Sequence, residues 1–96
     1  MTENIEQLKE FTKLVERFVQ LANEMKDEGT SLPTINAALM SASATYGSYV
    51  AAGNDGYLRP SGVEKLVESY RHHANRVQDI KKHIIQSAGE ENKSEN

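Results

Sequence analysis

Apolar residues recur every three or four positions along residues 1–28, and charged residues fill most positions between them. This spacing predicts an amphipathic helix of about 25 residues. Gly29 can end the helix, because glycine adopts the left-handed conformation that closes many helices. The apolar positions of this segment are Ile5, Leu8, Phe11, Leu14, Val15, Phe18, Val19, Leu21, Ala22 and Met25.

A second helix is predicted from about Leu32 to Ala52, where Ser31 can cap the start and Pro33 is tolerated in the first turn. Its pattern differs from the first, because no charged residue occurs between Gly29 and Asn54. One face carries the larger side chains, and the opposite face is small and neutral. The larger face comprises Ile35, Leu39, Ala42, Tyr46, Tyr49 and Val50; the smaller comprises Ala37, Met40, Ser41, Ala44, Ser48 and Ala51.

A third helix follows the turn signal Gly53-Asn54-Asp55-Gly56. Ser61 and Glu64 have the spacing of a capping box at its start, and Gly89 can end it. Residues 90–96 are polar, with no apolar residue to hold them in place, which predicts a disordered tail. The apolar positions of this segment are Val63, Leu66, Val67, Tyr70, Ala74, Val77, Ile84, Ile85 and Ala88, with Ile80 at the edge.

These three segments predict an all-α protein with a single domain over residues 1–89. Short connections between consecutive helices favour antiparallel neighbours, so we expect a three-helix up-down-up antiparallel bundle. The 96 residues contain no cysteine, which excludes disulfides and thiolate chemistry. The start of the chain lacks the apolar core of a signal peptide, so we expect a cytoplasmic protein.

The uncharged second segment predicts a homodimer. A helix without charge on any side is usually covered on every side, and small side chains let another backbone approach closely. We therefore expect dimerisation through this helix, with an interface formed by Ala37, Met40, Ala44, Ser48 and Ala51. Two alternatives are a monomer in which the small polar side chains face water and a membrane span over residues 34–53. The serines and threonines of the segment disfavour the membrane span.

Charge is distributed unevenly along the chain. Residues 1–29 carry seven acidic and four basic side chains, a net of −3, whereas residues 59–88 carry three acidic and six basic ones, a net of +3. The whole chain has a net charge of −3. This balance gives no electrostatic reason to bind nucleic acid or an anionic membrane, and we expect the bases of the third segment to neutralise the acidic face of the first.

No combination of residues predicts catalysis, so we expect the protein not to be an enzyme and to need no cofactor. The most suggestive group is Asp79 with His83, spaced i, i+4, yet no further ligand completes a metal site. His72 lies on the same polar face, and His73 lies at the edge of the apolar stripe. Surface pairing explains these residues better than metal binding does.

The function that fits these features is a homodimeric protein–protein interaction module with a protein partner that the sequence does not identify. The candidate partner or ligand contacts are Tyr46, Tyr49, Tyr57 and Arg71. The alternative is a small-molecule binding module, with a pocket between helices near Tyr46 and Tyr49, where alanine and glycine leave room.

Three runs of sequence resemble a known family: Phe18–Asn23, Ile35–Met40 with its Ala-Ala-Leu-Met motif, and Tyr49–Ala52. The chain is similar over residues 11 to about 85 to small helical bacterial proteins of the domain-of-unknown-function family numbered 3144. The resemblance implies a soluble helical protein without an assigned activity. It supplies no functional residue.

Overall fold

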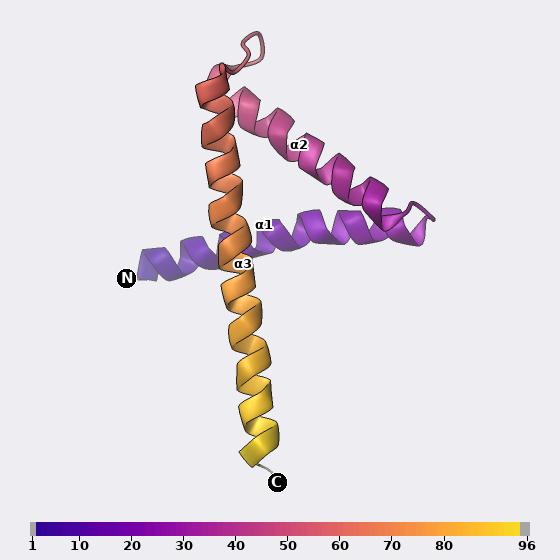
Figure 1. Ribbon diagram of the computed structural model, residues 1–96, viewed down its shortest axis with the longest axis vertical. Helices are drawn as coiled ribbons and strands as arrows, with labels where there is room; N and C mark the ends of the chain where they lie inside the picture. Colours follow the sequence, from indigo (N-terminus) through magenta and orange to yellow (C-terminus); the bar gives the residue numbers. More distant parts are fainter. Residues whose placement is uncertain (1, 95–96) are drawn as a thin grey trace. The chain divides into compact units, whose positions relative to one another are not determined.

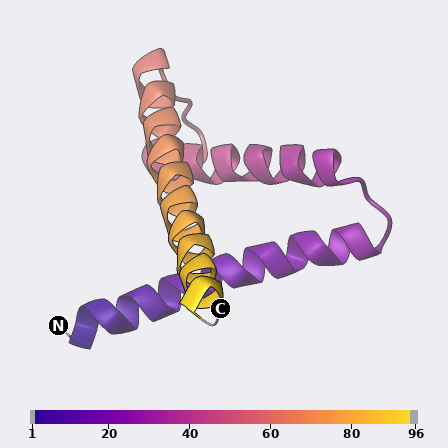
Figure 2. The same ribbon diagram turned by 60° about the horizontal axis from the view of Figure 1, so that its bottom comes forward.

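The computed structural model describes the backbone of residues 2–94 and the side chains of residues 4–89. Three helices make up the described chain: α1 (Thr2–Asp27), α2 (Leu32–Ala52) and α3 (Pro60–Ser94). No strand occurs within residues 2–94. Figure 1 follows the helices in chain order, and Figure 2 shows the same helices from a second direction. The all-α prediction is confirmed, with α2 at the predicted positions.

The turn between α1 and α2 is a Schellman motif, as the glycine at its centre predicts. Gly29 has a φ of 105°, and its amide donates to the carbonyl of Lys26 at 3.0 Å. The amide of Thr30 donates to the carbonyl of Met25 at 3.1 Å. These two bonds satisfy carbonyls that the end of α1 would otherwise leave unpaired.

Ser31 caps the start of α2. Its Oγ accepts a hydrogen bond from the backbone amide of Thr34 at 3.4 Å and donates to Thr34 Oγ1 at 2.8 Å. Pro33 is the second residue of the helix, where a missing N–H leaves no intrahelical bond unmade. At the other end, Gly53 has a φ of 78° and its amide donates to Tyr49 O at 2.8 Å, which is the simpler left-handed cap.

The predicted capping box at Ser61 and Glu64 is wrong. Helix α3 already begins at Pro60, and the amides of Gly62 and Val63 donate to the carbonyl of Arg59 at 2.8 and 3.1 Å. Proline is favoured at the first helical position because its fixed φ suits the helix. Ser61 therefore lies inside the first turn.

Helix α3 also continues beyond Gly89, the residue at which the sequence predicts its end. It extends to Ser94. A glycine inside a helix costs only about 1 kcal/mol relative to alanine, so a single glycine is a weak stop signal. Residues 90–94 of the predicted tail are thus helical, and residues 95–96 lie outside the described part of the chain.

The chain forms two compact units, Met1–Tyr46 and Gly47–Asn96, with the boundary inside α2. In the first unit, α1 and the first turns of α2 form a helical hairpin that separates with distance from the Gly29 turn, as both Figure 1 and Figure 2 show. Ile35, near that turn, is 6% exposed and is the only buried side chain of residues 4–89.

In the second unit, the last turns of α2 lie against the beginning of α3. A Cβ placed on Gly47 would stand 3.0 Å from Leu66 Cδ2, so the absence of a side chain at position 47 sets how closely Leu66 approaches α2. Leu66, Gly47 and Ser48 are all half-buried. Gly62, in the first turn of α3, is similarly close to Leu58 of the connector, with 3.1 Å between the added Cβ and Leu58 Cδ2.

Candidate interaction surfaces

The apolar stripe of α1 remains exposed in the structure. The sequence predicts this stripe as bundle core, but a two-helix hairpin that opens away from its turn cannot surround it. Phe18, for example, is 63% exposed. The side chains of this surface, called the α1 stripe below, are Ile5, Leu8, Phe11, Leu14, Val15, Phe18, Val19, Leu21 and Met25, all of them exposed.

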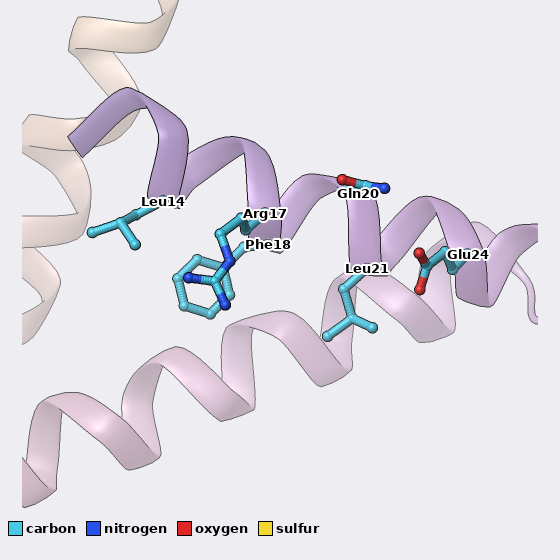
Figure 3. Close-up of a pocket in the computed structure, with 6 residues that line it drawn as sticks. All are labelled: Leu14, Arg17, Phe18, Gln20, Leu21 and Glu24. Atoms are coloured by element: carbon cyan, nitrogen blue, oxygen red, sulfur yellow. The ribbon is translucent and has the colours of Figure 1, made fainter. Parts of the chain in front are cut away.

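A hollow of about 450 Å³ lies along α1 near the turn. Figure 3 shows Leu14, Phe18 and Leu21 pointing to one side of α1 and Gln20 pointing to the other. The Arg17 guanidinium lies over the Phe18 ring in this view. All six residues that line the hollow belong to α1: Leu14, Arg17, Phe18, Gln20, Leu21 and Glu24. The predicted pocket residues Tyr46 and Tyr49 do not line it.

The small-residue face of α2 is accessible over most of its length. Ala37, Met40, Ala44 and Ala51 are exposed, whereas Ser48 is half-buried beside Gly47. The first four side chains are therefore available to another helix. The structure contains one chain, so their place in a dimer interface stays a prediction.

Two polar side chains of α2, Thr45 and Asn36, have partners within the helix. Thr45 Oγ1 donates to the carbonyl of Ser41 at 2.8 Å, and Asn36 Nδ2 lies 3.9 Å from Met40 Sδ. A polar side chain that bonds to its own helix can enter an apolar contact without leaving a donor unpaired. These polar residues are thus compatible with a covered helix face.

The apolar stripe of α3 is the third exposed surface. Its members are exposed from the first turn to the last described one, apart from the half-buried Leu66 and Ala74. Ile84 is 60% exposed and Ile85 71%. The exposed large side chains of this surface, called the α3 stripe below, are Val63, Val67, Tyr70, Val77, Ile80, Ile84 and Ile85.

The four predicted contact residues lie outside these surfaces, and Tyr46 and Tyr49 are 69% and 49% exposed on α2. Tyr57, in the connector, is 88% exposed. Arg71 pairs with Glu68 on its own helix, with 2.6 Å between Nη1 and Oε2. An exposed i, i+3 pair of this kind contributes little stability, so the guanidinium can exchange Glu68 for an external partner at small cost.

The described histidines do not form a metal site with the neighbouring carboxylates. His72 and His73 contact each other edge to face, with their ring centroids 5.6 Å apart. Among the described residues, no group of three or more His, Asp or Glu side chains is arranged to hold a metal ion. No helix in this part of the chain is both long and apolar enough to cross a membrane.

Comparison with known proteins supplies the family. The model of the family described as "Protein of unknown function (DUF3144)" matches residues 11–84. The chain belongs to the DUF3144 family. The match covers most of the chain and confirms the resemblance carried by the Ala-Ala-Leu-Met helix. No curated protein and no solved structure matches the chain significantly.

Sequence reasoning missed the close approach of Gly47 and Leu66. The signal that could have indicated it is the lone glycine inside an otherwise alanine-rich helix, since such a glycine often marks a close packing contact.

Proposed function

We propose that this DUF3144 protein is a non-enzymatic, homodimeric protein–protein interaction module in which the helices close as an up-down-up bundle and two copies meet through α2. The single observation that carries the proposal is the exposure of apolar side chains on every helix. Ile35 alone is buried among residues 4–89. Soluble monomers rarely expose continuous apolar patches of this extent.

The exposed area supports an assembly. The chain has 8842 Å² of accessible surface, whereas the mass of 10.7 kDa corresponds to about 5500 Å² for a folded monomer. The difference is about 3300 Å² per chain. Obligate homodimers bury roughly 2000–5000 Å² in total, or about 1000–2500 Å² per chain, so a dimer interface together with closure of the helices accounts for an area of this size.

The character of α2 supports its place at the centre. Its 21 residues include no charged side chain, and its small-residue face is exposed at Ala37, Met40, Ala44 and Ala51. A helix without charge on any side is typically covered on all sides. In an up-down-up bundle α1 and α3 would cover two sides of α2, and a second copy would cover the third.

A charge on the small-residue face tests the dimer. We expect Ala44→Glu to weaken association at least tenfold, because a carboxylate in a close helix contact loses its hydration without gaining a partner. Gln20→Glu is the matched control: it adds the same charge on the side of α1 that points away from Leu14, Phe18 and Leu21 in Figure 3. Sedimentation equilibrium measures the association, and far-ultraviolet circular dichroism checks that the helices remain. Equal association of both variants would contradict the proposal.

The interaction role needs a partner protein as well as a dimer. Tyr57 and Arg71 are the proposed contacts, since one side chain is highly exposed and the other holds only a surface ion pair. Aromatic and arginine side chains dominate the energy of many interfaces. The test compares proteins captured from the native host by the unaltered chain and by a Tyr57→Ala, Arg71→Ala variant. Partners lost with the variant support the role, and identical captures contradict these contacts.

A further inference from the structure

Four apolar side chains at the hollow on α1 follow the spacing of a coiled-coil seam. This seam consists of Leu14, Phe18, Leu21 and Met25. The residues are separated by four, three and four positions, the spacing at which side chains of two helices interlock. They are between 37% and 63% exposed, and no residue of α2 lines the hollow beside them. Within the unit Met1–Tyr46, this edge of the α1 stripe is therefore open to another helix.

Charged side chains beside the seam change sign along α1. At 100° per residue, one flank of the seam carries two bases followed by two acids: Lys13, Arg17, Glu24 and Glu28. The like charges of each half are four residues apart, a spacing at which they repel one another. No residue of opposite charge stands three or four positions from Arg17 or Glu24. A second helix that brings the opposite charges would relieve both repulsions.

This order of charges is complementary to itself when two copies of α1 run antiparallel. In one register every seam residue lies level with a seam residue of the other copy, such as Phe18 with Leu21. Arg17 then flanks Glu24 of the second copy, and the two-fold axis makes the same pair twice. A shift by one heptad in either direction brings Arg17 to Arg17 or Glu24 to Glu24, which like-charge repulsion disfavours. Glu10, on the same flank, lies beyond the end of the second α1 in this register.

We propose that this edge of α1 binds the same edge of α1 from a second copy of the chain, antiparallel, with Arg17 of each copy beside Glu24 of the other. The inference goes beyond the proposed homodimer, because it uses α1 alone and a surface separate from the small-residue face of α2. Two self-complementary contacts per chain are the arrangement of a closed tetramer, in which α1 joins two α2-linked dimers. A contact of four side-chain layers is small, so we expect it to form above the micromolar range.

Single cysteines test the contact, because the chain has none of its own. Leu21→Cys lies in the seam, and Leu8→Cys is the matched control on the same helix, since both leucines are 51% exposed. In the proposed register the two copies of position 21 are about 4.5 Å apart along the helix axis, and the two copies of position 8 about 35 Å apart. A short bismaleimide reagent is added above the micromolar range, and the covalent dimer is measured under denaturing conditions.

We expect Leu21→Cys to give several-fold more covalent dimer than Leu8→Cys. Equal yields would overturn the antiparallel contact, because a parallel pair of α1 helices cross-links at both positions. Absence of covalent dimer from both variants would also overturn it, and is the result expected if α3 of the same chain covers the seam.

Charge reversal in the Leu21→Cys chain tests the ion pairs. Arg17→Glu and Glu24→Arg should each lower the yield of covalent dimer several-fold, because each variant brings like charges together across the two-fold axis. The double variant Arg17→Glu, Glu24→Arg restores opposite charges and should recover the yield. If the double variant stays as low as the single ones, Arg17 and Glu24 do not meet across copies.

The same variants separate this inference from the proposed homodimer. If Ala44→Glu weakens association in sedimentation but Leu21→Cys does not cross-link, the α2 dimer stands and the α1 contact falls. If Ala44→Glu leaves association unchanged while Leu21→Cys cross-links in preference to Leu8→Cys, the α1 contact stands and the α2 dimer falls. The two failures are therefore distinguishable.

Discussion

A Cβ on Gly47 of α2 would stand 3.0 Å from Leu66 Cδ2 of α3, so the two helices approach closely at a position that carries no side chain. The atom that it would meet is the end of a flexible side chain, and Leu66 is only half-buried. The contact therefore tolerates a small side chain at position 47 but not a large one.

Substitutions at Gly47 should depend on the size of the new side chain. We expect Gly47→Ala to change the free energy of unfolding by less than about 1 kcal/mol, because improved helix propensity offsets a small shift of Leu66. Gly47→Val should destabilise by about 1–3 kcal/mol through overpacking. Urea denaturation measures both.

A double-mutant cycle isolates the contact with Leu66. The cost of Gly47→Val should fall by roughly 1 kcal/mol when Leu66 is replaced by alanine, since residues in direct contact show coupling energies of this order. Additive effects would mean that the two positions do not touch in solution.

Alanine substitutions of two glycines, one in a turn and one in a helix, should change the stability of the protein in opposite directions. Gly29→Ala should destabilise the protein by about 1–2 kcal/mol, because its φ of 105° is unfavourable for a residue with a Cβ. Gly89→Ala should stabilise it by up to about 1 kcal/mol, since a Cβ there meets no atom within 4 Å and the backbone is helical. Thermal unfolding of both variants checks the signs.

The two serines at helix starts should also differ. Ser31→Ala should cost about 1 kcal/mol, because it removes the side chain that accepts the Thr34 amide. Ser61→Ala should stay within about 0.5 kcal/mol, since Ser61 lies inside the first turn of α3. If Ser61→Ala proves as costly as Ser31→Ala, the capping box predicted from the sequence operates after all.

The Arg71–Glu68 pair should matter for recognition more than for stability. Arg71→Ala should change the free energy of unfolding by less than about 0.5 kcal/mol, because an exposed i, i+3 pair is weak and screened by salt. Unfolding at low and high salt measures this. A loss above 1 kcal/mol would show that the guanidinium has a structural partner beyond Glu68.

The helices were predictable because their signals are local. Apolar periodicity located all three helices. Gly29 ends α1 and Ser31 caps the start of α2, both through hydrogen bonds to residues a few positions away. The start of α3 was mistaken because Pro60 and Ser61 both favour a helix start and the proline prevailed. Gly89 failed to end α3 because one glycine weakens a helix without terminating it.

The packing was less predictable, because it depends on contacts between distant segments. Leu8, Phe18 and Ile85 belong to stripes that the sequence assigns to a core, yet all three are exposed in the described structure. The amphipathic pattern shows that a face becomes covered but not which helix covers it. The close approach of Gly47 and Leu66 became known only from the structure.

The proposed function depends on a second copy covering the exposed stripes and the uncharged α2. Sedimentation equilibrium of the unaltered chain at micromolar concentration tests this most directly. The account predicts a mass twice the 10.7 kDa of one chain, stable on dilution through the micromolar range. A mass of 10.7 kDa, with the helices intact by circular dichroism, would contradict it.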